Sequence, residues 1–299
     1  MTMNHEQMAA KIEQGDGFIA ALDQSGGSTP KALAGYGVEE GAWSTEEEMY
    51  GLIHQMRSRI ITSPAFASGK VIGAILFERT MDGQVEGKPT PEALIDRGVV
   101  PFIKIDKGLE AEASGVQMMK PMPEVSGLLE RAKQRGVFGT KERSVINLAN
   151  PEGIAAVVAQ QFDVAREVLA HGLVPIIEPE VNIKSPERDA ADRFLLQELL
   201  KNLEQVDEKV MLKLSIPAEP GLFTPLVNHP KVLRVVALSG GFNRSDACSE
   251  LAKNPGMIAS FSRALLSDLR AQQSDEEFNN TLGEAIDEIY EASTDKVPA

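Results

Sequence analysis

The stretch Val210-Met-Leu-Lys-Leu-Ser-Ile216 places a single charged side chain, Lys213, inside a run that is otherwise mostly apolar. Short runs rich in Val, Ile and Leu are typical of parallel strands that helices cover on both faces. Burying a lone ammonium group is costly, so such groups persist in pairs, in networks or in functional sites. The stretch therefore predicts a buried strand and marks a residue with a functional role.

Seven further segments share this pattern and predict buried strands. The weakest is 138–145, because half of it is polar or charged. With 209–216, the predicted strands are 17–23, 71–77, 100–106, 138–145, 173–181, 232–239 and 257–262.

Amphipathic helical patterns lie between these strands. Ser44 or Thr45 can cap a helix, with Glu47 or Glu48 closing a capping box. Further helices are expected at 153–171, 192–203, 245–253 and 275–292. Eight strands alternating with helices predict an α/β fold, a closed (β/α)8 TIM barrel, and no linker or repeat divides residues 1–299 into more than one domain.

Composition excludes several classes of partner. A formal net charge of −14 disfavours nucleic acid and anionic membranes, so an anionic substrate needs a local positive site. The single cysteine, Cys248, excludes an internal disulfide, and we expect it to be a packing or surface residue. No apolar run approaches the roughly 20 residues of a membrane span, and residues 1–15 lack the apolar core of a secretory signal. We therefore expect a cytoplasmic protein, and a homo-oligomer remains compatible with the sequence.

Three more predicted strands carry charged side chains two residues apart. Alternate side chains of a strand share one face, and the carboxyl ends of barrel strands form the mouth where active sites lie. Seven charges on four successive strands thus predict an active site, in preference to unrelated structural salt bridges. They are Lys104, Asp106, Lys141, Arg143, Glu178, Glu180 and Lys213.

Lys213 has the environment that a nucleophilic amine requires. Burial and cationic neighbours in Lys141 and Arg143 would both disfavour its ammonium form. A neutral amine attacks a ketone, and the resulting iminium withdraws electrons and so permits reversible carbon–carbon cleavage. Glu178 or Glu180 would then carry the protons of imine formation and breakdown.

The loop after the first strand, Asp23-Gln24-Ser25-Gly26-Gly27-Ser28, offers a base and a phosphate site. Asp23 would take the hydroxyl proton whose loss begins cleavage, or it would only cap the turn. Ser25 and Ser28, with Lys104 nearby in the barrel, would hold one phosphate.

A second phosphate site is expected after the seventh and eighth strands, where barrels commonly bind phosphate through backbone N–H groups. Ser239-Gly240-Gly241 follows the seventh strand, and Ser262-Arg263 follows the eighth and adds a guanidinium group.

The sequence disfavours a catalytic metal. None of the histidines lies at a predicted strand end or has ligand spacing; they are His5, His54, His171 and His229. A magnesium site made of Asp106, Glu178 and Glu180 alone remains open as an alternative. We expect no cofactor.

With these motifs assembled, the chain resembles the class I fructose-bisphosphate aldolases, in their shorter bacterial form, from about Gly17 to the C-terminus. Seven short motifs in the family's order are collectively specific. They are Ala-Leu-Asp-Gln-Ser-Gly-Gly-Ser (21–28), Ile-Lys-Ile-Asp-Lys-Gly (103–108), Thr-Lys-Glu-Arg (140–143), Ile-Glu-Pro-Glu (177–180), Met-Leu-Lys-Leu (211–214), Leu-Ser-Gly-Gly (238–241) and Ser-Phe-Ser-Arg-Ala (260–264).

The resemblance implies metal-independent, reversible cleavage of fructose 1,6-bisphosphate to dihydroxyacetone phosphate and glyceraldehyde 3-phosphate, as in glycolysis and gluconeogenesis. Tagatose bisphosphate as the substrate and a catalytically silent scaffold remain alternatives. The resemblance implies that Lys213 forms the Schiff base, that Glu178 is the proton acceptor with support from Glu180, Lys141 and Arg143, and that Asp23 takes the hydroxyl proton. It implies that Ser239, Gly240 and Arg263 bind the phosphate of the dihydroxyacetone phosphate half. It implies that Ser25, Ser28 and Lys104 bind the phosphate at the other end of the sugar.

Two departures from the family's animal enzymes bear on mechanism. Those enzymes carry Glu where this chain has Gln24, and they end in a tyrosine that assists proton exchange at the substrate carbon. Here the last tyrosine is Tyr290, so either another group or a differently placed Tyr290 must serve.

Overall fold

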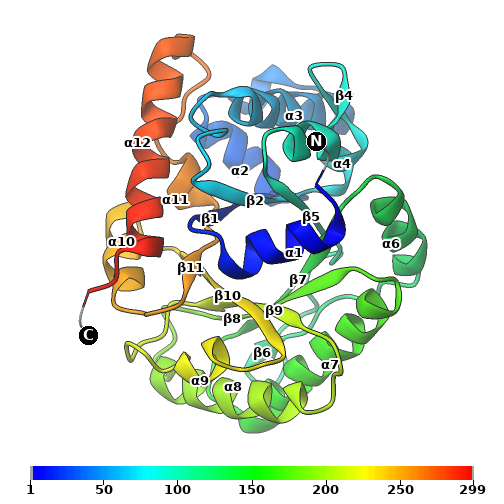
Figure 1. Cartoon of the computed structure of the whole chain (residues 1–299), viewed down its shortest axis with the longest axis vertical. Coiled ribbons are helices and arrows are strands. Elements are labelled where there is room, and N and C mark those ends of the chain that lie inside the picture. The colour runs from blue at the N-terminus through cyan, green and yellow to red at the C-terminus, as the bar shows by residue number, and fades with distance from the viewer. Residues whose placement is uncertain (1–2, 298–299) are drawn as a thin grey trace.

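Eight parallel strands surround the centre of the molecule in their order along the chain, as the computed structural model of residues 3–297 shows (Figure 1). The ring closes where the backbone N–H of Ala21 donates to the carbonyl of Phe261 at 3.2 Å. The predicted eight-stranded barrel is therefore confirmed. Its strands are β1 (Phe18–Leu22), β2 (Val71–Leu76), β5 (Val100–Lys104), β7 (Gly139–Ile146), β8 (Val174–Val181), β9 (Val210–Ser215), β10 (Val232–Leu238) and β11 (Ile258–Ala259).

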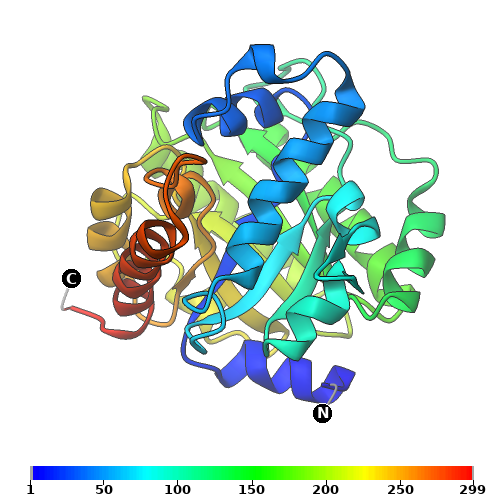
Figure 2. The ribbon, with the colours of Figure 1, turned by 90° about the horizontal axis from the view of Figure 1, so that it is seen from above.

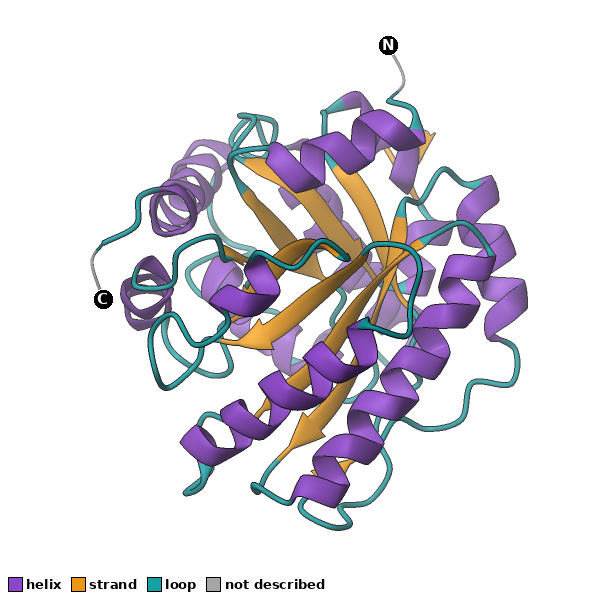
Figure 3. Ribbon diagram, turned by 60° about the horizontal axis from the view of Figure 1, so that its bottom comes forward, coloured by secondary structure: helices purple, strands orange, loops and turns teal. Residues whose placement is uncertain are grey.

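Helices form the outer layer around this sheet (Figure 3). Three short strands lie outside the barrel ring: β3 (Gln84–Val85) pairs with β4 (Lys88–Pro89), and β6 (Val116–Gln117) pairs with β7. The helices are α1 (His5–Gln14), α2 (Ser28–Gly35), the 3₁₀ turn η1 (Glu40–Ala42), α3 (Glu46–Thr62), α4 (Glu78–Asp82), α5 (Thr90–Asp96), α6 (Val125–Gln134), α7 (Pro151–Ala170), α8 (Arg188–Leu203), α9 (Thr224–Val227), α10 (Arg244–Ala252), α11 (Arg263–Leu266) and α12 (Asp275–Thr294).

The five predicted helices correspond to α3, α7, α8, α10 and α12. Of the two possible caps for α3, Thr45 is the one used: its side chain accepts from the N–H of Glu48, whose carboxylate accepts from the Thr45 N–H. Helix α7 ends where predicted, because Gly172 adopts a φ of 74° directly after it. None of the described helices is both long enough and apolar enough to cross a bilayer.

Helix α1 is a feature that the sequence reading missed, because its residues look like a polar tail. Asn4 and Gln7 form a capping box that starts the helix. Its few apolar side chains, Met8 and Ile12, are buried against the lower interior of the barrel. The helix lies across the amino end of the strands, so it closes the barrel opposite the mouth (Figure 2).

The barrel interior changes from apolar to charged along its axis. Phe102, Ile176 and Met211 form part of a buried apolar cluster near the amino ends of their strands. Two residues further along the same strands stand Lys104, Glu178 and Lys213, which therefore share the inward-facing side. The apolar layers thus form the floor on which the charged layer rests.

Candidate active site

The inward-facing charges line a cavity of about 780 Å³ at the carboxyl ends of the strands. The structure brings all twelve predicted site residues into its wall. They are Asp23, Ser25, Ser28, Lys104, Lys141, Arg143, Glu178, Glu180, Lys213, Ser239, Gly240 and Arg263.

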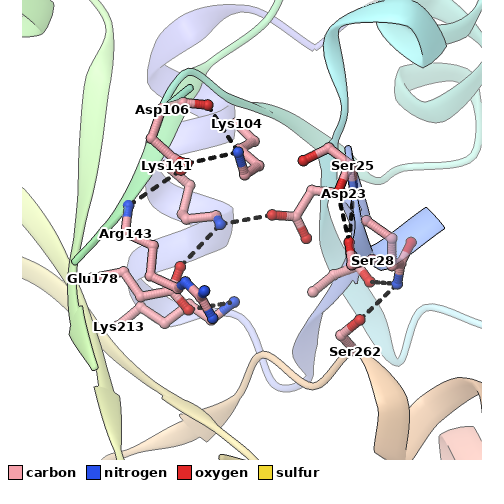
Figure 4. Close-up of polar contacts among 12 residues, drawn as sticks. Asp23, Ser25, Ser28, Lys104, Asp106, Lys141, Arg143, Glu178, Lys213 and Ser262 are labelled. Atoms are coloured by element: carbon pink, nitrogen blue, oxygen red, sulfur yellow. Dashed lines mark hydrogen bonds and ion pairs between the residues drawn. The ribbon is translucent and has the colours of Figure 1, made fainter. Parts of the chain in front are cut away.

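Lys213 lies on β9 with only 3% of its surface exposed. Its Nζ lies 3.2 Å from Oε1 of Glu178 on the neighbouring strand β8 (Figure 4). The pairing between these two strands ends at Ile177 and Leu212, immediately before the two charged residues. The amine is therefore buried and faces the cavity beside a carboxylate that can exchange protons with it.

Lys141 on β7 lies between two carboxylates. Its Nζ is 2.7 Å from Oδ2 of Asp23 and 3.0 Å from Oε2 of Glu178. Burial alone would raise the pKa of Asp23, but the ammonium groups of Lys141 and Lys213 outweigh it and hold that pKa well below its usual range. Burial likewise works to lower the pKa of Lys141, yet Asp23 and Glu178 raise it above its ordinary value. Asp23 is thus ionised at neutral pH and can accept a proton.

Arg143 and Glu180 form a second ion pair on the cavity wall, with 2.8 Å between Nη1 and Oε2. Burial raises the pKa of Glu180 despite this guanidinium group.

Asp106 contacts residues of two neighbouring strands, β5 and β7. One of its oxygens lies 2.7 Å from Nζ of Lys104, and the other accepts the backbone N–H of Arg143 at 3.2 Å.

The carboxylates of the alternative magnesium site each face a cation instead. Asp106 pairs with Lys104, Glu180 with Arg143, and Glu178 with two lysines. Residues 3–297 contain no group of three or more His, Cys, Asp or Glu side chains arranged to hold a metal ion.

Two loops offer the groups expected at phosphate sites. The backbone N–H of Ser25 donates to Oγ of Ser28, which donates back to the Ser25 carbonyl, so the loop before α2 is tightly folded. In the loop after β10, Gly240 adopts a φ of 59°, and a Cβ there would lie 2.7 Å from Ile183. Glycine is therefore required at that position.

The sequence reading missed several residues of the cavity wall. Lys31 lies one helical turn after Ser28, so the i, i+3 spacing was a signal that could have revealed it. Ser262 appeared only as the neighbour of Arg263. Arg270, which follows the short helix α11, gave no pattern at all.

Tyr290 does not take part in the cavity. Its ring packs against Nζ of Lys70, which lies 5.3 Å from the ring centroid and directly precedes β2 at the amino end of the barrel. The idea that Tyr290 replaces the C-terminal tyrosine of the animal enzymes is therefore wrong.

The sequence pattern that defines the family described as "Glycolytic: Fructose-bisphosphate aldolase class-I" matches residues 4–212. The chain belongs to the class-I fructose-bisphosphate aldolases. The match includes every predicted catalytic residue of this aldolase up to β8 and ends one residue before Lys213.

Solved aldolase structures share this fold. Fructose-bisphosphate aldolase from Plasmodium falciparum, solved with TRAP and a small-molecule inhibitor, superposes with a TM-score of 0.78 at 20% identity, covering 99% of this chain and 95% of that one. An archaeal fructose 1,6-bisphosphate aldolase gives a TM-score of 0.52 at 12% identity, covering 96% and 99% of the two chains. Another archaeal aldolase structure, with its catalytic lysine covalently bound to the carbinolamine intermediate of the substrate, gives 0.50 at 12% identity, covering 96% and 100%.

Proposed function

We propose that this class-I aldolase reversibly cleaves fructose 1,6-bisphosphate to dihydroxyacetone phosphate and glyceraldehyde 3-phosphate through a Schiff base on Lys213. The observation that carries the proposal is the buried Lys213 amine, 3.2 Å from Glu178 in a cavity whose wall also holds the groups expected at two phosphate sites. The family match supports the same reaction.

In the proposed cycle, the Lys213 amine attacks the ketone carbon and water leaves, which forms an iminium ion. Asp23, ionised beside Lys141, takes the hydroxyl proton of the carbon that becomes the aldehyde. The carbon–carbon bond then breaks, and its electron pair moves into the iminium to give an enamine and the free aldehyde. Protonation of the enamine and hydrolysis of the imine release dihydroxyacetone phosphate and regenerate the amine.

Glu178 is the proposed proton carrier, since its carboxylate lies within reach of both Lys213 and Lys141. Glu180 and Arg143 would support the charge balance of the wall as an ion pair. The groups proposed for phosphate are Ser239, Gly240 and Arg263 for the dihydroxyacetone phosphate half, and Ser25, Ser28 and Lys104 for the other end.

Reductive trapping tests the proposal. Borohydride added with dihydroxyacetone phosphate should inactivate the enzyme and leave the mass of the reduced adduct on Lys213. Lys213→Met should show neither trapping nor turnover. Lys107→Met is the matched control, because Lys107 pairs with Glu78 and does not line the cavity. Full activity in Lys213→Met would contradict the proposal.

Two measurements separate the alternatives. A metal-dependent aldolase would lose activity with a chelator, whereas a Schiff-base enzyme keeps it. A comparison of kcat/KM for fructose and tagatose bisphosphates decides the substrate stereochemistry, and absence of turnover with both would indicate a silent scaffold.

For the cellular setting, we infer a single-domain cytoplasmic enzyme that binds neither nucleic acid nor membranes. The net charge of −14 supports this inference. Light scattering would show whether it forms the homo-oligomer that its composition allows.

A further inference from the structure

Gln24 connects two walls of the cavity across the seam where the barrel closes. Gln24 follows β1 and Ser262 follows β11. Nε2 of Gln24 donates to Oγ of Ser262 at 2.6 Å (Figure 4). The same nitrogen donates to the carbonyl of Ala21 at 3.2 Å. Both Gln24 and Ser262 line the cavity.

The orientation of the Gln24 amide is set by Arg57 on α3, a guanidinium group that is fully buried. Arg57 Nη2 donates to the carbonyl of Gln24 at 2.6 Å and to its side-chain Oε1 at 3.1 Å, and Nη1 donates to Thr80 at 2.7 Å. Within residues 3–297, no carboxylate lies in ion-pair distance of Arg57. A guanidinium group can only donate, so the amide oxygen must face Arg57 and the amide nitrogen must face Ser262.

These hydrogen bonds fix which way the Ser262 hydroxyl is used. Its oxygen accepts from Gln24, so its hydrogen is left for another acceptor, and the described residues supply none. The hydroxyl lines the cavity and belongs to the residue directly before Arg263. A fully ionised phosphate bound there has only acceptor oxygens, so it can accept the hydrogen bond that the Ser262 hydroxyl has left to donate.

We propose that Ser262 donates a hydrogen bond to the substrate phosphate held by Arg263, and that Arg57 is a positioning residue that fixes the direction of this hydroxyl through Gln24. The inference rests on the proposed aldolase function and adds Ser262 to its binding machinery, with Gln24 and Arg57 as the residues that position it. A carboxylate at position 24 would reverse the arrangement: it would accept the Ser262 hydrogen, and the cavity would lose a donor.

A double-mutant cycle tests the proposal, with KM and kcat measured for cleavage of fructose 1,6-bisphosphate. Ser262→Ala and Gln24→Glu should each raise KM by about 10- to 150-fold, the cost of one hydrogen bond to a charged group, while kcat changes less than about threefold. Because both changes remove the same donor, the double variant should be no worse than Ser262→Ala by more than about twofold.

Charge repulsion alone would give a different result. If the added carboxylate acted only by repelling phosphate, Gln24→Glu would raise KM by the same factor in the wild-type and Ser262→Ala backgrounds, which would overturn the proposal. Gln134→Glu adds the same charge at an exposed site that does not line the cavity, and it should leave KM unchanged.

Arg57 is tested through its conservative variant. Arg57→Met frees the Gln24 amide to rotate and should raise KM as Gln24→Glu does, whereas Arg57→Lys keeps a charged donor and should restore part of the loss. Should Arg57→Met fail to fold, the Gln24 and Ser262 cycle still decides. If the wild type is trapped at Lys213 but KM is unchanged in Ser262→Ala, this inference is overturned and the proposed function stands. If the wild type is not trapped, the proposed function itself is overturned.

Discussion

The Nζ atom of Lys213 and Oε1 of Glu178 lie 3.2 Å apart on neighbouring strands, although 35 positions separate the two residues in the chain. The other oxygen of the same carboxylate lies 3.0 Å from Nζ of Lys141. One buried carboxylate therefore serves two lysines. It can take a proton from the first while the second, held by Asp23, keeps its charge.

Glu178→Gln should lower kcat by about 10²- to 10⁴-fold, because an amide cannot carry the protons of imine formation and breakdown. Steady-state kinetics and the rate of borohydride trapping measure the effect. Glu284→Gln, at an exposed position of α12, is the control and should behave as wild type. Unchanged kcat in Glu178→Gln would remove this residue from the mechanism.

Lys141→Met should destabilise the protein by about 3–5 kcal/mol, because it leaves two buried carboxylates without their shared cation. In the wild type, the depressed pKa of Asp23 stabilises the fold above the ordinary pKa of 3.8, and that contribution is lost as pH falls through the depressed value. Without Lys141, the pKa of Asp23 moves back toward or above 3.8, so this contribution disappears and the acid-dependent loss of stability should become smaller than in the wild type. Urea unfolding at several pH values checks both effects, and a stability profile identical to that of wild type would contradict the assigned ion pairs.

Asp192→Asn should stabilise the protein near neutral pH. Asp192 is buried on α8, where its Oδ2 accepts the N–H of Ala218 at 2.9 Å, and burial raises its pKa from 3.8 to about 6. The folded state therefore binds more protons than the unfolded state in this window, and stability falls as pH rises from 3.8 to about 6. The shift sets an upper limit of roughly 3 kcal/mol on the gain. Thermal unfolding across this range should give a flatter profile for the variant, with kcat unaffected.

Lys296→Met should lower Tm while leaving kcat unchanged. Nζ of Lys296 donates to the carbonyls of Met257 and Ala292, both at 2.7 Å, and so fastens the chain end beside the start of β11. That position is at the amino end of the barrel, opposite the cavity. Calorimetry and steady-state kinetics check the two parts, and a large fall in kcat would indicate that the chain end reaches the active site after all.

The eight strands and the inward charges could be predicted from local sequence. Strand periodicity is a property of neighbouring residues: Lys141 and Arg143 must share a face because they stand two apart on one strand. Burial of the flanking apolar residues then directs that face inward. The six predicted site residues on strands meet in one cavity for this reason, and the other six reach it because they closely follow the carboxyl ends of strands; the roles of all twelve in catalysis remain predictions for the experiments above.

Other features were decided only by closure of the barrel. Gln24 and Ser262 are 238 positions apart, and Arg57 reaches Gln24 from a helix 33 positions away, so no local pattern reveals their contact. Helix α1 was hidden because two buried side chains, Met8 and Ile12, suffice to hold a mostly polar helix against the barrel floor. Sequence alone determined which side chains face the axis, because that depends on alternation along each strand. The tertiary structure alone decided which of them hydrogen-bond, because that depends on how distant strands and helices meet around the ring.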